Sequence, residues 1–174
     1  MSRSALRASL LLTISLLVGC GWHLRGSGGG GAGLQGIMVY LLPQMGEGPL
    51  SKATDDALQS YGAKVVSDRR TADWVLVLVS QNTSSRTVSI TSQGEAQAYE
   101  LTYTLRFRVD APNGTPLLSE QSVASDTSYQ TNPHDILGSE SQARRLTEQM
   151  RGQAIDLMMG RLANIPRQHT TPSH

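Results

Sequence analysis

The single thiol of the chain lies in a motif at which bacteria attach lipid. Leu17-Val18-Gly19-Cys20 has the aliphatic residue, the small residues and the cysteine of a lipobox, and it follows an apolar run at 8–18. Two arginines precede that run, and this is the layout of a secretory signal peptide, too short to span a bilayer. An ordinary signal peptide followed by an unrelated cysteine is the alternative. Because the thiol follows the apolar run directly, we predict a signal peptide over 1–19 and a lipidated Cys20.

Three arginines are candidates for contact with anionic groups such as phosphates. Arg106 and Arg108 are two residues apart, so in a strand they share a face, and Arg86 is expected on the neighbouring strand. Guanidinium groups bind phosphate in a bidentate manner. The alternative, which we favour, is ion pairing with carboxylates of the same face. Those carboxylates are Glu100, Asp110 and Glu120.

The remaining reactive side chains do not form a catalytic or metal-binding pattern. The histidines are His23, His134, His169 and His174, and none has a second ligand at the spacing of a metal-binding helix. One cysteine excludes a multi-cysteine zinc or iron–sulfur site. The sequence has neither a G-x-S-x-G elbow nor a phosphate-binding P-loop. We therefore expect no enzyme and no cofactor, and the net charge of +1 argues against a nucleic-acid partner.

The polar residues of the chain are mostly uncharged. Ser, Thr, Asn and Gln together number 50, against 29 charged residues, and the charged fraction of 17% is below the roughly 25% of an average soluble domain. Depletion of charge is typical of the centre of a protein interface. A Ser/Thr-rich β protein would have a similar composition, because Thr favours strands. The composition alone leaves both interpretations open.

The N-terminal half of the mature chain is expected to alternate strands with one helix. A Gly-rich tether follows the cysteine and completes the segment 20–36. An apolar strand is predicted at 37–42, and apolar periodicity after Gly48-Pro49 predicts a helix over 50–61. The segment 64–66 is a second short strand candidate. A further strand begins at Trp74, apolar on both faces and so central in a sheet, and continues to Ile90.

The C-terminal half contains the clearest pattern in the chain. From Tyr99 to Asp110 apolar and polar residues alternate without a break, which predicts a long strand with one buried face. A turn at 112–114 leads into a strand over 117–129. A helix follows over 139–164, and the tail 166–174 is expected to be disordered. The domain 37–165 is therefore predicted as α+β, a mostly antiparallel four-stranded sheet with two helices packed on one face.

The residues after the lipobox resemble the LPS-assembly lipoprotein family LptE. The run Cys20-Gly21-Trp22-His23-Leu24-Arg25-Gly26 is similar to the start of these proteins, and so is Gly48-Pro49-Leu50-Ser51-Lys52-Ala53 at the first helix. The order of strands and helices extends the resemblance over 20–165. It implies a non-catalytic lipoprotein that plugs the LptD β-barrel and helps to assemble it. Together the two proteins would deliver lipopolysaccharide to the outer leaflet.

The resemblance also implies a location and a lipid contact. Gly21 is compatible with transport to the outer membrane, where acyl chains on the cysteine would hold the protein. Family members are thought to contact lipopolysaccharide through basic residues near the tip of the long hairpin. Here the tip is Ser92, Gln93, Gly94 and Glu95, without a basic residue. Another periplasm-facing adaptor or pilot lipoprotein, and a lipid-anchored enzyme, are the alternatives.

Overall fold

The computed structural model describes residues 33–90, 92, 94, 96–130 and 136–166. The predicted signal peptide, Cys20 and the predicted C-terminal tail from 167 onward lie outside these residues. The elements in chain order are β1 (Met38–Pro43), α2 (Pro49–Ser60), β2 (Lys64–Val65), the 3₁₀ turn η1 (Arg69–Thr71), β3 (Trp74–Ile90), β4 (Ala96–Asp110), β5 (Pro116–Gln130) and α3 (Ile136–Leu162). Residues 33–36, which the sequence assigned to the tether, already belong to the fold, because Leu34 is completely buried.

The strands form one mixed sheet in the order β2-β1-β3-β4-β5. β1 runs parallel to both β2 and β3, whereas β3, β4 and β5 form an antiparallel meander. The α+β class is therefore confirmed, but the four-stranded, mostly antiparallel detail is wrong. The physical reason is that α2 connects β1 to β2, and a helical crossover brings the next strand back in the same direction.

Local sequence signals explain where α2 begins and ends. Pro49 occupies the first helical turn, and the hydroxyl of Ser51 accepts a hydrogen bond from the Gly48 N–H at 2.9 Å. Gly62 has φ of +87°, a left-handed conformation that only glycine adopts without strain, directly after the helix. The predicted helix over 50–61 is thus present within a residue at each end.

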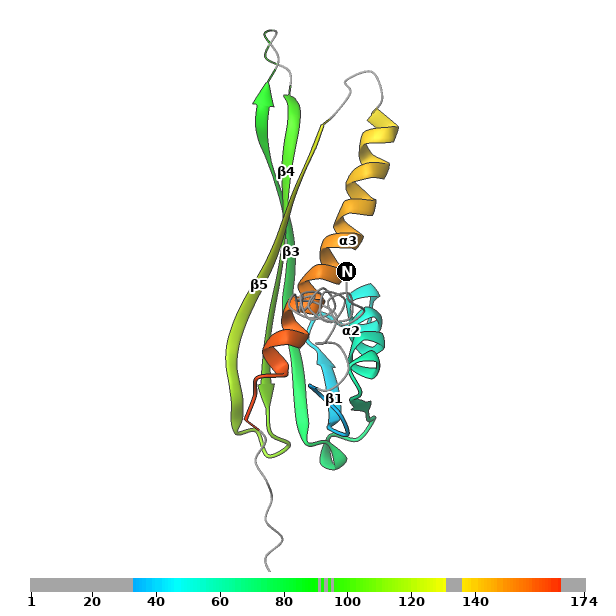
Figure 1. The fold of residues 1–174 in the computed structure, drawn as a ribbon, viewed down its shortest axis with the longest axis vertical. Helices are drawn as coiled ribbons and strands as arrows, with labels where there is room; N and C mark the ends of the chain where they lie inside the picture. Colours follow the sequence, from blue (N-terminus) through cyan, green and yellow to red (C-terminus); the bar gives the residue numbers. More distant parts are fainter. Residues whose placement is uncertain (1–32, 91, 93, 95, 131–135, 167–174) are drawn as a thin grey trace, which may run out of the picture.

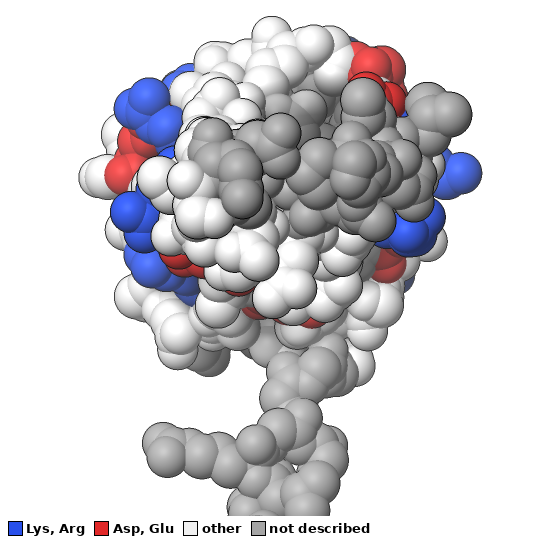
Figure 2. Space-filling view, turned by 90° about the horizontal axis from the view of Figure 1, so that it is seen from above, with Lys and Arg blue, Asp and Glu red and all other residues white. Residues whose placement is uncertain are grey.

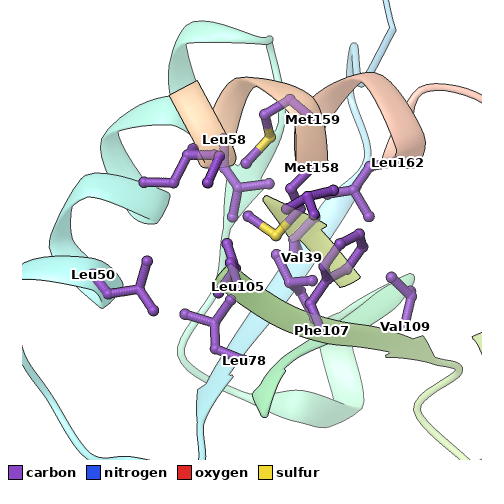
Figure 3. Packing of buried hydrophobic residues seen from close by; sticks show 14 of the residues in the cluster. Val39, Leu50, Leu58, Leu78, Leu105, Phe107, Val109, Met158, Met159 and Leu162 are labelled. Atoms are coloured by element: carbon purple, nitrogen blue, oxygen red, sulfur yellow. The ribbon is translucent and has the colours of Figure 1, made fainter. Parts of the chain in front are cut away.

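The alternation of β4 places one row of side chains in the core. Leu101, Tyr103, Leu105, Phe107 and Val109 are at most 4% exposed. Figure 3 shows Phe107 among side chains of α3, with the α2 side chains beside them. The predicted facing of this strand is confirmed.

The apolar stripe of α3 is shifted from the predicted one. Met150, Ala154, Met158 and Leu162 are buried as expected, but Leu157 is half exposed. Residues at i, i+4 and i+8 follow one line along a helix, and Leu157 lies about 100° away from Met158. The buried positions beside the line are instead Ile155 and Met159.

The sheet is longer than the layer of helices beside β1. Figure 1 shows β3, β4 and β5 continuing upward beyond β1 and α2, with only α3 beside them. β1 pairs with β3 only from Trp74 to Leu78. The upper half of the sheet is therefore three-stranded, and most of β3 from Gln81 onward is exposed.

Candidate functional site

One face of the upper sheet is polar and lies away from α3. Because successive side chains of a strand point to opposite faces, the residues between the buried ones of β4 share this face with their register partners. Thr104, for example, lies between Asn82 of β3 and Ala124 of β5. We call this surface the hydroxyl face. Its members are Ser80, Asn82, Ser84, Arg86, Glu100, Thr102, Thr104, Arg106, Ser122, Ala124, Asp126 and Ser128.

Arg86 forms an ion pair on the hydroxyl face. Its Nε lies 2.8 Å from Oε1 of Glu100 and its Nη2 lies 3.2 Å from Oε2, a two-point contact across β3 and β4. The hydrogen bond to this carboxylate, followed by its charge, raises the pKa of Arg86 above its usual value. The Arg86 side chain is 73% exposed, so the pair adds little to stability. The pair instead balances the positive charge of Arg86 with the negative charge of Glu100 on this face.

The other two candidate arginines are paired in the same way. Arg106 forms an ion pair with Glu120 of β5. The Nε of Arg108 lies 3.1 Å from Oδ2 of Asp110 on its own strand. All three predicted arginines thus have the carboxylate partners that the alternative interpretation proposed, and their contact with phosphate groups stays a prediction.

Acidic and basic side chains lie close together at the upper end of the molecule. Figure 2 looks onto this end, and blue basic and red acidic atoms lie next to each other at the left and right margins of the view. The hydroxyl face has two basic members, Arg86 and Arg106, and two acidic members, Glu100 and Asp126. It can therefore exchange hydrogen bonds with a partner while carrying little net charge.

The opposite face carries a layer of polar contacts beneath α3. The Tyr103 hydroxyl donates to Oε1 of Gln81 at 2.7 Å, and the Ser125 hydroxyl donates to Oε1 of Gln153 at 2.5 Å. Burial raises the pKa of Tyr103, and a hydrogen bond with Arg151 opposes this effect. These residues were not among the predicted site residues, although polar residues next to the apolar positions of α3 are the signal that could have indicated them.

Loss of the Tyr103 proton should destabilise the domain at high pH. A phenol whose pKa is raised by folding contributes stability below its unfolded pKa of about 10, and this is lost as the pH rises through the folded value. Tyr103→Phe should lower the free energy of unfolding by about 1 kcal/mol at pH 8, because the hydrogen bond to Gln81 is lost. It should also make the free energy of unfolding fall less steeply between pH 8 and 11. Urea unfolding between pH 8 and 11 measures both. Parallel pH profiles for the two proteins would contradict the assignment.

One hollow of the surface has a single charged side chain, Asp73, among its lining residues. This hollow, of about 490 Å³, is lined by residues including Asp73, Trp74 and Leu117. The Asp73 carboxylate accepts a hydrogen bond from the Met38 N–H at 2.8 Å, which gives it a structural role. Within the described ranges, no group of three or more His, Cys, Asp or Glu side chains could hold a metal ion. Nor does any described helix have the length and hydropathy to cross a membrane.

Comparison with known proteins identifies the family. The model of LptE, described as lipopolysaccharide-assembly, matches residues 39–162. The chain belongs to the LptE family. A curated LPS-assembly lipoprotein LptE of Photorhabdus laumondii is 28% identical over 161 residues, with 90% of this chain and 85% of that protein covered. One of Pectobacterium atrosepticum is 29% identical over 160 residues, with the same coverage.

Solved structures of lipoproteins share the LptE-family fold of this chain. The rare lipoprotein B of Shewanella oneidensis has a TM-score of 0.64 at 22% identity and covers 72% of this chain and 93% of its own. A lipoprotein B of Nitrosomonas europaea has a TM-score of 0.67 at 18% identity, and the match covers 83% of this chain and 91% of that protein.

LptE-family membership settles the broad class of this protein. It is a non-enzymatic lipopolysaccharide-assembly lipoprotein of the bacterial envelope, which confirms the resemblance and the expectation that it is not an enzyme. Cys20, the predicted site of lipidation, and half of the hairpin tip lie outside the described residues. At the tip, Ser92 and Gly94 are described, and Gly94 has φ of +82°.

Proposed function

We propose that this protein plugs the lumen of the outer-membrane barrel LptD, helps that barrel to assemble, and with it delivers lipopolysaccharide to the outer leaflet. The observation that carries the proposal is the hydroxyl face, taken together with membership of the LptE family. The proposed location is the outer membrane, with the domain in the barrel lumen or facing the periplasm.

The chemistry of the hydroxyl face suits a barrel lumen. The interior of a large outer-membrane barrel is polar. Hydroxyl and amide groups such as those of Thr102, Thr104 and Asn82 both donate and accept hydrogen bonds, so they can match a polar wall. A charge that is buried without a partner is costly, and here Arg86 and Arg106 are each paired with a carboxylate of the same sheet. Among the charged members of the face, only Asp126 has no ion pair within the described residues, so enclosing the surface would leave a single carboxylate for the wall to match.

Contact with lipopolysaccharide would require a change in the ion pairs of the hydroxyl face. A phosphate group would have to displace Glu100 from Arg86, or Glu120 from Arg106. Arg86 is the more accessible of these two arginines, at 73% exposure of the side chain. It is the residue at which we would look first for such a contact.

Removal of the acyl acceptor should release the protein from membranes. Cys20→Ala eliminates the only thiol of the chain, and stable anchoring needs more than one acyl chain. We expect the variant to take up no palmitate label and to fractionate with soluble proteins. Cys20→Ser is the matched control, because it keeps the size of the side chain and should behave identically. Continued labelling of either variant would contradict the lipobox assignment.

The barrel partner is tested by affinity purification of the tagged lipoprotein from detergent-solubilised outer membranes. We expect one very large β-barrel protein to co-purify in equal amount. Capture of a secretin or another envelope protein would instead support the adaptor or pilot alternative. A purified domain that turns over a substrate would overturn the proposal.

A further inference from the structure

The edge of β3 has an empty position beside it in the upper half of the sheet. β1 fills this position next to Trp74–Leu78, and its last hydrogen bond runs from the Gln44 N–H to the Leu78 carbonyl at 3.0 Å. The chain then turns away, and no described strand pairs with this side of β3 from Gln81 to Ile90. We call the unfilled position beside Gln81–Thr87 the strand lane.

A single contact shows which backbone groups face the strand lane. The Gln81 N–H points away from β4, because it donates to the sulfur of Met45 at 3.1 Å. In an antiparallel pair, residues alternate between facing the partner strand and facing away from it. The register with β4 is unbroken from Ser80 to Thr87. The N–H and C=O groups of Thr83, Ser85 and Thr87 therefore face the lane.

The strand lane lacks the usual protection of an edge strand. Natural edges are kept from pairing by Lys, Pro, short length or unpaired charge. The segment 81–90 contains no Lys and no Pro, and the charge of its one basic residue, Arg86, is bonded to Glu100. The other edge of the upper sheet, β5, also has no Lys or Pro over 122–130, but it carries Asp126, which has no ion pair among the described residues. The β5 edge therefore has an unpaired charge that the β3 edge lacks, as expected if β3 rather than β5 accepts a strand.

We propose that the strand lane is filled by an extended, charge-poor segment of the barrel in which the domain is proposed to sit, so that this inference rests on the proposed function. The side chains that flank the lane on the α3 side are Gln81, Thr83, Ser85 and Thr87. They offer little apolar surface, so two free copies of this chain would gain little by pairing through them. A segment of a partner that already holds the domain by a broad interface pairs at high effective concentration.

Proline at a lane-facing position tests the strand pairing. In sheets proline is tolerated where the missing N–H faces solvent, so Ser85→Pro should leave the purified full-length lipoprotein folded. Gln130→Pro on β5 is the matched control, since its register with Ala98 places its N–H away from β4 on the opposite edge, and Gln130 is not a member of the hydroxyl face. We expect Ser85→Pro to lower co-purification of the barrel at least fivefold and Gln130→Pro to change it less than twofold, with circular-dichroism melts of both lipoproteins close to wild type.

Hydrogen exchange of the wild-type protein tests the same pairing without a substitution. The amides of Thr83, Ser85 and Thr87 should exchange quickly in the free lipoprotein and slowly in the barrel complex. Those of Asn82 and Ser84, bonded to β4, should be slow in both. If Ser85→Pro captures the barrel normally and the three amides still exchange quickly in the complex, no barrel segment pairs in the strand lane. The proposed function would then remain unaffected. Equal losses in both proline variants, or crosslinks between two copies at Ser85, would also overturn it. A wild type that captures no barrel would refute both.

Discussion

Replacing Phe107 by alanine should lower the free energy of unfolding by about 3–5 kcal/mol. The Phe107 side chain has no exposed surface, and it packs in the cluster that holds Val39 of β1 and Met158 of α3 (Figure 3). Truncation would leave a cavity at the point where the sheet meets α3. The loss is a large part of the 5–15 kcal/mol that stabilises a typical domain.

Thermal and urea unfolding of the purified lipoprotein measure this effect. At about 3–5 °C per kcal/mol, Tm should fall by roughly 10–20 °C. Phe107→Leu is the matched control, because it keeps most of the buried volume and should cost less than half as much. A Phe107→Ala protein that melts within two degrees of wild type would show that β4 is not packed as described.

The facing of β4 could be predicted because its sequence carries the information locally. Twelve residues alternate strictly, and a shift of one position would expose Phe107 and bury Arg106. The partners of the arginines followed from the same alternation, since same-face carboxylates are within reach across neighbouring strands. Here one local pattern determined both the core and the polar surface.

The parallel part of the sheet could not be predicted in this way. β1 and the first part of β3 are continuous apolar runs, which carry no alternation to define a direction or a neighbour. β2 has only two residues, so its pairing depends on the path of the chain after α2. The polar layer of Gln81, Tyr103 and Arg151 was missed for a related reason, because its contacts join residues far apart in sequence.

An unpaired charge on the hydroxyl face should disrupt the proposed complex. Thr104 lies between Asn82 and Ala124, so a lysine there has no carboxylate opposite. Thr102 lies on the same strand and face but opposite Asp126, so a lysine there gains a partner. An isolated charge enclosed at an interface costs several kcal/mol, whereas a paired one costs less. Thr104→Lys should therefore lower co-purification of the barrel at least tenfold, and Thr102→Lys should lower it far less.

Three measurements separate this effect from simple damage to the fold. The Tm of each purified lipoprotein should remain near that of wild type, because Thr102 and Thr104 are partly exposed in the free domain. Thr104→Ala should cost less than about 1 kcal/mol of binding, as most single truncations in an interface do. Cells that produce only Thr104→Lys should become permeable to large antibiotics. If Thr104→Lys and Thr102→Lys retain the barrel equally while both stay folded, the hydroxyl face does not contact the lumen wall.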